Sequence, residues 1–277
     1  MPSPMDRLLE SVRVLPSIPK ALREVLESLN KENVTVAEIT RPLESDPALS
    51  AKVLRMSNAA HYGLPKQVAS VEEAAYLVGM NAIRTMVISS GLMGSFDAIP
   101  GFDMKRFWRL SLLSGFLARD VASILHLPTE EAYTAALMHG LGVLAIHGAF
   151  PEEARSIDSA CVDLSPVDRA ECEMGLLGFH HGDVGSEIAS RWKLPDSIVQ
   201  AIRFYPYPKR LAAPHLAGVV HCSVALAIAL EDHVPHTNWG LDVDTELCRK
   251  LGLDWDKLKQ RHEKFELYRT AADDMVS

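Results

Sequence analysis

The sequence predicts an all-α protein, and three observations support that prediction. Apolar residues recur at the spacing of amphipathic helices, helix start signals recur along the chain, and no segment alternates apolar and polar residues as a half-buried strand does. The chain has 277 residues, of which 48% are hydrophobic and 23% charged, so it can bury a large core and is not generally disordered.

About five short helices are expected in the first hundred residues. Pro19 can occupy the first turn of the first helix. Thr35 and Glu38 have the spacing of a capping box, and Asp46 followed by Pro47 is typical of an N-cap with proline at the first helical position. These signals predict short helices joined by tight turns.

Further signals continue this pattern toward residue 94. Ser70 and Glu73 repeat the capping-box spacing, Gly79 is expected to end that helix, and Asn81 is expected to cap the next one. Two helices joined in this way could form a helix-turn-helix. The second helix offers a single arginine, Arg84, so we favour ordinary helix packing over DNA reading.

A linker-like segment, Asp97–Gly101, divides the chain. We predict an N-terminal helical lobe at residues 1–100 and a second helical lobe with C-terminal tail helices at residues 101–277. Besides two shorter helices in the tail, the helices expected in the second lobe are Phe107–Leu125, Glu130–Ile146, Pro166–Leu177, Val184–Trp192, Asp196–Phe204 and Ala213–Glu231.

The composition argues against several classes of function. The formal net charge is −8, whereas nucleic-acid binding normally needs a basic face. The four cysteines form no C-x-x-C pair, which is typical of reduced thiols in the cytosol. Two uncharged stretches, Ala132–Pro151 and Leu211–Leu230, contain histidine with glycine or proline, which favours buried helices over membrane spans. With no signal-peptide core at the N-terminus, we expect a cytoplasmic protein without membrane contact.

Histidines are the main candidates for chemistry. The sequence contains no H-E-x-x-H motif, nucleophile elbow or P-loop. A catalytic zinc needs about three protein ligands, but a lone histidine on an apolar helix is more often a hydrogen-bonded core residue. The candidate cluster consists of His139, His147, His180, His181, His215 and His221.

Several segments, in order along roughly residues 10–230, resemble the HDOD family of degenerate relatives of the HD phosphohydrolases. The resemblance implies an HD-domain-like multi-helix bundle and a role in bacterial signal transduction. The segments are Glu44–Leu49, Lys52–Gly63, Val68–Ala74, Leu77–Met80, Phe107–Trp108 with Ser111, Ala135–Gly142, Phe179–Gly185 and Arg191–Pro195.

The resemblance also implies where the metal site of the HD enzymes would lie, and this sequence departs from that site. Leu110 stands in place of the first histidine, Gly140 in place of the aspartate of the His–Asp pair, and Ser223 in place of the distal aspartate. His139 and His181 remain, and two histidines are too few for a tight catalytic metal. We therefore expect a vestigial pocket with no catalytic residue, metal or cofactor.

These departures favour a regulatory module over an enzyme. The expected partner is a signalling protein, namely a sensor, receiver or output protein, and a small molecule in the vestigial pocket is a second candidate. The alternative is a residual metal-dependent phosphohydrolase acting on a nucleotide or cyclic dinucleotide. A DNA-binding regulator is the weakest of the three hypotheses, because it depends on the helix-turn-helix interpretation alone.

A candidate partner surface follows the helix expected at Asp196–Phe204. Tyr205 and Tyr207 alternate with Pro206 and Pro208, which is typical of a stiff exposed loop. The resemblance also implies a fourth histidine near Ile202–Tyr205, where Arg203, Phe204 and Tyr205 stand instead. We expect both tyrosines to be available to a partner.

Overall fold

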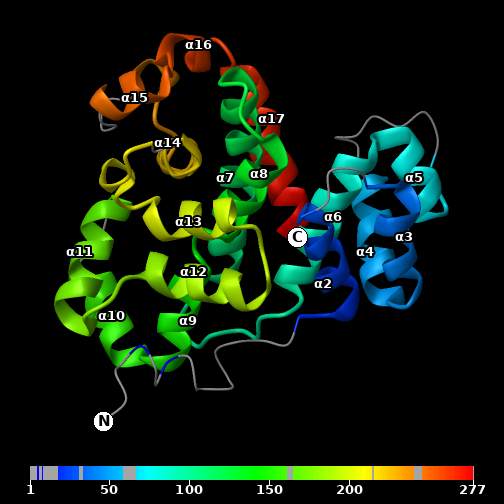
Figure 1. Ribbon diagram of the computed structural model, residues 1–277, viewed down its shortest axis with the longest axis horizontal. Helices are drawn as coiled ribbons and strands as arrows, with labels where there is room; N and C mark the ends of the chain where they lie inside the picture. The colour runs from blue at the N-terminus through cyan, green and yellow to red at the C-terminus, as the bar shows by residue number, and fades with distance from the viewer. Residues whose placement is uncertain are drawn as a thin grey trace. The chain divides into compact units, whose positions relative to one another are not determined.

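The computed structural model describes Met5, Leu8 and residues 18–30, 34–58, 67–160, 165–213, 215–239 and 245–276. All regular elements in these residues are helices, as Figure 1 shows, so the predicted all-α class is confirmed. Part of the HDOD-like N-terminal signature, residues 59–63, lies outside the described residues.

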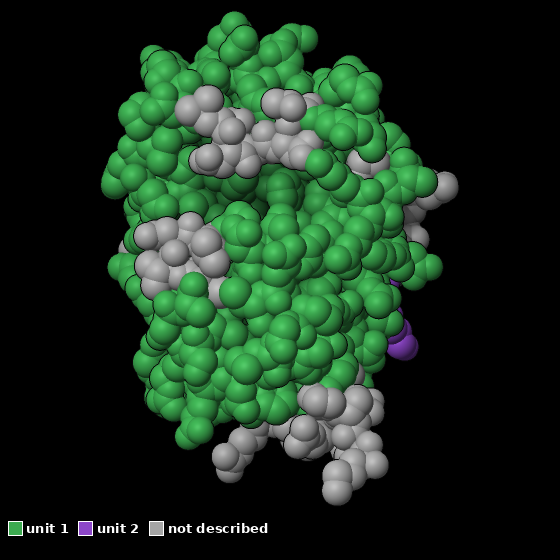
Figure 2. Space-filling model, turned by 90° about the vertical axis from the view of Figure 1, so that its left-hand side faces the viewer, with its two compact units in different colours: residues 1–15, 98–191, 196–276 green, residues 16–97, 192–195, 277 purple. Residues whose placement is uncertain are grey.

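The chain forms two compact units, which are coloured separately in Figure 2. Unit 2 contains Pro16–Asp97 and the short segment Trp192–Pro195, whereas unit 1 is built mainly from Ala98–Arg191 and Asp196–Val276. The change of unit after Asp97 lies within the linker-like segment seen in the sequence. The separate assignment of Trp192–Pro195 was not expected.

Unit 2 is a group of short helices, three of which have side-chain caps at their N-termini, formed by Thr35, Asp46 and Ser70. The Glu38 amide donates to Thr35 Oγ1 at 3.3 Å, and the Leu49 amide donates to Asp46 Oδ1 at 3.0 Å, as the spacing predicted. The helices are α2 (Lys20–Glu27), α3 (Val36–Glu44), α4 (Pro47–Ser57), α5 (Val71–Val78) and α6 (Met80–Met93), with a 3-10 turn, η1, at Ser28–Asn30.

The turn between α5 and α6 differs from the expectation. Gly79 joins the two helices directly with a φ of +92°, and Asn81 lies inside α6, so the predicted cap at Asn81 is wrong. A single glycine is enough because it adopts positive φ without a Cβ clash. Arg84 and Thr85 are buried at 8% and 1% exposure, which leaves neither of them free to read a base edge.

Unit 1 is organised around the long helix α7, which packs against α8, α14 and α17, while α12 packs against α9 and α13. Figure 1 shows α14 end-on beside α7 and α13. The helices are α7 (Met104–Ile124), α8 (Thr129–Met138), α9 (Leu141–Ala149), α10 (Pro151–Ala160), α11 (Pro166–Leu177), α12 (His181–Arg191), α13 (Asp196–Phe204), α14 (His215–Glu231), α15 (Thr245–Leu251), α16 (Trp255–Lys259) and α17 (His262–Val276), with 3-10 turns η3 (Pro208–Arg210) and η4 (His236–Asn238).

The structure corrects two predictions for this unit, one about a single helix and one about the tail. The segment Glu130–Ile146 is not one helix, because it breaks at His139 and Gly140 into α8 and α9. The His139 ring bonds to the Ala136 carbonyl oxygen at 2.6 Å, and this side-chain bond competes with the backbone ladder at the break. The tail holds three described helices instead of two shorter ones, and the last of them, α17, has 15 residues.

Glycine allows α9 and α12 to approach closely. A Cβ on Gly142 would lie 1.9 Å from the carbonyl oxygen of His181, a distance that no alanine could tolerate. The close contact brings the start of α12 to the break between α8 and α9. As a result, His181 and His139 lie near each other, with a coulombic interaction between their rings.

Two further predictions from the composition were that the chain has no membrane span and that its cysteines are reduced. Among the described helices, none combines the length and hydropathy that crossing a bilayer requires. Cys172, Cys222 and Cys248 form no disulfide among the described residues. Cys161 lies outside the described residues.

Candidate functional site

A cavity of about 450 Å³ lies in unit 1, which is within the size range of small-molecule sites. Residues at or near the ends of several helices line it, and Figure 2 shows a hollow in the surface of this unit. Of the five residues assigned to the vestigial pocket, the cavity is lined by Leu110, His139, Gly140 and His181.

Ser223 is the fifth of these residues, and it is not part of the cavity wall. Its side chain is fully buried on α14, and its Oγ has no hydrogen-bond partner among the described residues. The next residue, Val224, lines the cavity instead. Adjacent residues of a helix point in directions about 100° apart, so a family resemblance that is uncertain by one position does not determine which side chain faces the cavity.

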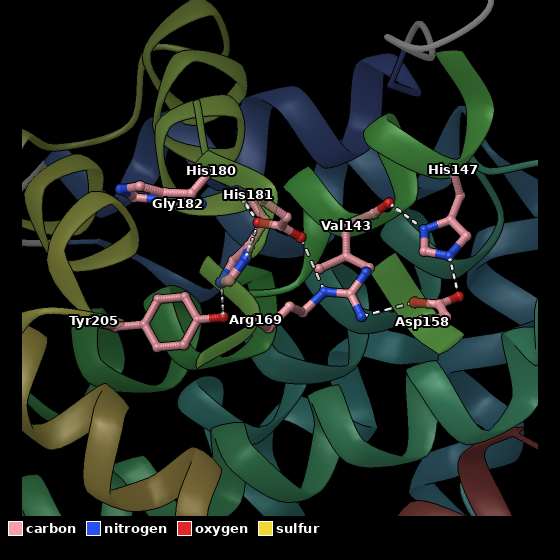
Figure 3. A network of polar contacts seen from close by, with 9 residues as sticks. Val143, His147, Asp158, Arg169, His180, His181, Gly182 and Tyr205 are labelled. Carbon is pink, nitrogen blue, oxygen red and sulfur yellow. Dashed lines mark hydrogen bonds and ion pairs between the residues drawn. The ribbon is translucent and has the colours of Figure 1, made fainter. Parts of the chain in front are cut away.

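His181 is held on both sides of its ring (Figure 3). Its Nδ1 lies 2.6 Å from Glu173 Oε2, and its backbone amide donates to the same oxygen at 2.7 Å. Its Nε2 lies 2.6 Å from the hydroxyl of Tyr205. Both ring nitrogens are therefore engaged inside the protein.

Tyr205 is buried at 3% exposure, so its assignment to an exposed partner loop is wrong. Its amide donates to the Ala201 carbonyl oxygen at 3.0 Å, which extends α13 and turns the ring toward the buried side of that helix. Burial, with the nearby charge of Glu173, raises the pKa of the Tyr205 hydroxyl, so this group stays protonated.

Tyr207, the other predicted surface residue, is half-buried. The guanidinium carbon of Arg210 lies 4.0 Å from the centre of its ring, a cation–π contact. The ring of His180 is 5.5 Å away. Tyr207 thus keeps some exposure, but it is not a freely projecting side chain.

A chain of ionic contacts continues from His181 along the cavity wall, from the fully buried Glu173 to the partly exposed Asp158 (Figure 3). Glu173 Oε1 accepts from Arg169 Nε at 2.9 Å, and Arg169 Nη1 donates to Asp158 Oδ1 at 2.8 Å. The other oxygen of Asp158 lies 2.8 Å from His147 Nε2, and His147 Nδ1 lies 2.8 Å from a backbone carbonyl oxygen. The network links α9, α10, α11 and α12.

The electrostatics of this network favour its ionised form. Burial acts to raise the pKa of Glu173, but the His181 ring, the Arg169 guanidinium and the hydrogen bonds together lower it. Burial likewise opposes ionisation of Asp158, whose pKa is nevertheless lowered by His147 and Arg169. Glu173 and Arg169 were not among the residues predicted from the sequence. Their four-residue spacing is that of an ion pair on one helix face, but such pairs usually lie on exposed faces and so did not indicate a buried site.

His139 has a different character from His181. Burial lowers its pKa from 6.5 to about 4, so its ring is neutral near pH 7. Because Nδ1 is bonded to the Ala136 carbonyl oxygen, Nδ1 carries the proton and Nε2 is an acceptor. His139 lines the cavity, and no partner for its Nε2 is present among the described residues. It can accept a hydrogen bond from a molecule in the cavity.

Gly140 and its surroundings leave no room for a side chain. A Cβ at this position would lie 2.6 Å from Cε2 of Phe107, so the phenyl ring fills the space an aspartate would need. Leu110, one turn further along α7, adds an apolar side chain to the same wall. Within the described residues, no three His, Cys, Asp or Glu side chains are grouped as a metal would require.

Comparison with known proteins decides the family. The profile of the HDOD domain matches residues 15–208, which is most of the chain. The chain belongs to the HDOD family. The match includes the cavity residues from Phe102 to Tyr205, whereas α14, which also lines the cavity, lies beyond it.

Solved structures show the same fold for this HDOD domain. A candidate phosphohydrolase from Shewanella amazonensis SB2B has a TM-score of 0.81 with 29% identity, and the alignment covers 98% of both chains. An HDOD domain protein of unknown function from Geobacter sulfurreducens has a TM-score of 0.81 with 19% identity, covering 98% of this chain and 97% of that one. A candidate signal transduction protein from Marinobacter aquaeolei VT8 has a TM-score of 0.78 with 22% identity, covering 97% of this chain and 60% of that one.

A longer relative is found among curated proteins. It is an uncharacterized protein of Treponema pallidum (strain Nichols), 24% identical over 228 residues, which are 80% of this chain and 44% of the relative. This HDOD domain therefore spans less than half the length of that relative.

Proposed function

We propose that this HDOD domain is a non-catalytic signal-transduction module whose ancestral metal pocket has lost its ligands. The observation that carries the proposal is the 2.6 Å hydrogen bond between the Tyr205 hydroxyl and His181 Nε2. Histidine binds a metal through the lone pair of a ring nitrogen. Here one nitrogen faces Glu173 and the other faces Tyr205, so no lone pair of His181 is directed at open space.

The other residues around the cavity do not fit a divalent metal either. Gly140 has no donor atom, and the Phe107 ring occupies the place of the missing side chain. Of the lining carboxylates, Asp158 and Asp232 are each paired with an arginine, and Asp103 is exposed and caps α7 by accepting from the Arg106 amide. His139 then remains as a single imidazole, which falls short of the three protein ligands of a catalytic zinc.

A second candidate function is residual metal-dependent phosphoester hydrolysis. The Glu173–His181 pair favours it, because a carboxylate commonly orients a metal-bound histidine in this way. The name of the Shewanella protein, 29% identical to this chain, points in the same direction. The engaged Nε2 of His181 and the blocked space at Gly140 make this the weaker candidate.

Metal analysis combined with an activity assay tests the proposal. The purified domain should contain less than about a tenth of an equivalent of manganese, iron or zinc, and should not hydrolyse bis(4-nitrophenyl) phosphate with added manganese. Tyr205→Phe, which frees His181 Nε2, should not restore metal, because Gly140 and Leu110 still supply no ligand. Stoichiometric metal in the wild type, with turnover that His139→Ala abolishes, would overturn the proposal.

The partner in this proposal is another signalling protein in the cytoplasm. The name of the Marinobacter protein supports the signalling role, and the absence of a disulfide among the described Cys172, Cys222 and Cys248 is in line with the compartment. Tyr207 remains the candidate contact residue, since Tyr205 is buried. Tyr207→Ala should weaken capture of the partner in co-purification from the native cell. Tyr76→Ala, at a tyrosine that is 72% exposed in unit 2, is the matched control and should not.

A further inference from the structure

The cavity wall contains polar groups that have no partner within the protein. Ser111 lines the cavity and is fully buried, yet its Oγ makes no hydrogen bond within the described part of the chain. Arg169 also lines the cavity, and its Nη2 is unpartnered although its other nitrogens are engaged. Buried polar groups are rarely left unsatisfied, so both point to a molecule that completes them.

His139 supplies the complementary group. Its neutral ring presents Nε2 as an acceptor, because the proton on Nδ1 is directed to the Ala136 carbonyl oxygen. The cavity therefore offers two unused donors, at Ser111 and Arg169, and one unused acceptor, at His139. A ligand that satisfies all three has both a carbonyl-type oxygen and an N–H or O–H group.

The charges around the cavity argue against an ionic ligand. Arg169 already lies between two carboxylates, Glu173 and Asp158, so an incoming anion would be repelled. The carboxylate of Asp232 is paired with Arg106 at 3.4 Å. Among the lining residues, a cation would find a carboxylate that is not ion-paired with an arginine only at Asp103, which is exposed to solvent and accepts from the Arg106 amide. A neutral molecule therefore suits the buried part of the cavity better than either ion.

One part of the cavity wall is apolar and partly aromatic, beside the polar residues. The rings of Phe102, Phe107 and Tyr205 line it together with Leu110 and Val143. The Phe102 and Phe107 rings are 5.7 Å apart between centroids at an interplanar angle of 57°. Aromatic walls of this kind favour a flat ring system.

We propose that the cavity binds a neutral aromatic carboxamide or lactam, with its carbonyl oxygen accepting from Ser111 and Arg169 and its N–H donating to His139. This inference rests on the proposed function, since it takes the pocket as a ligand site instead of a metal site. It names the class of small molecule that would act on the signalling module.

Three probes of nearly equal size and different charge test the inference on the full chain. They are 1-naphthamide, which is neutral, 1-naphthoate, which is an anion, and 1-naphthylmethylamine, which is a cation. Saturation-transfer NMR and calorimetry should show binding of the amide at least about tenfold tighter than that of either ion, because a buried uncompensated charge costs more than a paired dipole. Equal or tighter binding of an ion, or no binding of the amide, would overturn the inference.

A pair of serine variants tests the location. Ser111 and Ser114 both lie on α7, are both fully buried, and both have a hydroxyl with no partner among the described residues, but Ser114 does not line the cavity. Ser111→Ala should weaken 1-naphthamide binding by about three- to tenfold, the value of one hydrogen bond, and Ser114→Ala should not. Equal affinities in the two variants would exclude this cavity.

The ligand-binding test and the test of the proposed function can fail independently of each other. Metal content and phosphoester turnover are measured without the probes, so a domain that holds no metal and binds no amide contradicts the ligand inference alone. A domain with a stoichiometric metal and turnover contradicts the proposed function whatever the probes do.

Discussion

Tyr205 is the residue on which the interpretation of the site depends. From the sequence it belonged to a proline-rich exposed loop, but in the structure its hydroxyl lies 2.6 Å from His181 Nε2 at 3% exposure. The phenol thus completes a buried contact series that runs from Tyr205 through His181 to Glu173. A buried hydroxyl that bonds to a buried histidine in this way contributes to stability, and its contribution can be measured.

Tyr205→Phe should reduce the free energy of unfolding by about 1–3 kcal/mol, because it removes a buried hydroxyl and leaves His181 Nε2 unsatisfied. Urea denaturation monitored by circular dichroism measures the change. Tyr207→Phe is the matched control, since Tyr207 is half-buried two residues away, and it should change stability by less than about 0.5 kcal/mol. Similar losses in the two variants would contradict the assigned role of the Tyr205 hydroxyl.

His139 gives the stability a pH dependence. The pKa of this ring is lowered by burial from 6.5 to about 4, so the unfolded chain takes up a proton before the folded one as the pH falls. Stability should therefore decrease as the pH drops from about 6.5 to about 4, by at most about 2 kcal/mol between pH 7 and pH 5.

Comparison with His139→Gln isolates this contribution. Burial also lowers the pKa of His180, so the wild-type profile contains both groups, and the difference between the two proteins reports His139 alone. Glu173 and Asp158 have lowered pKa values and lose their stabilising effect only at still lower pH. Unfolding curves that respond identically to pH in the variant and the wild type would refute the prediction.

At the scale of elements, the site depends on how closely α9 approaches α12. The break between α8 and α9 places His139 at the cavity, and the contact at Gly142 brings in His181. The sequence pattern indicated one continuous helix here, because the segment is uncharged from Ala132 onward. Helix packing decided the break.

Gly142→Ala should destabilise the protein by more than about 3 kcal/mol, because its Cβ would lie 1.9 Å from the His181 carbonyl oxygen and the two helices would have to separate. Thermal unfolding provides the measurement. Gly175→Ala is the control, since a Cβ there meets nothing within 4 Å, and in the interior of α11 it should stabilise by up to about 1 kcal/mol. Tolerance of Gly142→Ala would mean that α9 and α12 do not pack so closely.

At the scale of the molecule, a buried carboxylate of α7 helps to hold the C-terminal helix α17, beside a second ion pair between Arg109 and Asp273. Asp120 is 6% exposed and accepts from Lys264 Nζ at 2.7 Å, Arg261 Nη1 at 3.2 Å and the Tyr268 hydroxyl at 3.2 Å. Asp120 lies inside the segment matched by the HDOD profile, whereas its three donors and all of α17 lie beyond it. The tail helix is thus part of unit 1 and not an appended segment.

Asp120→Asn should loosen α17, with a loss of about 1–3 kcal/mol, because three donors lose a charged acceptor but two of them are partly solvated. Hydrogen exchange of residues 262–276 should increase more than that of α8. Glu266→Gln is the control, because its pair with Arg269 is exposed and should contribute less than about 1 kcal/mol. Unchanged exchange in α17 would show that Asp120 does not hold it.

The sequence by itself determined the all-α class, the caps at Thr35, Asp46 and Ser70, and four residues of the cavity wall: Leu110, His139, Gly140 and His181. Caps and amphipathic spacing act over three or four residues, so local sequence is enough to specify them.

Only the tertiary structure decided the rest of the site. The bond between Tyr205 and His181 joins residues 24 apart, the Phe107 ring fills the space beside Gly140, and the buried Glu173 reaches His181 from another helix. Such contacts depend on the distances between packed helices, which are set by the whole core and are not encoded in the spacing along any one segment.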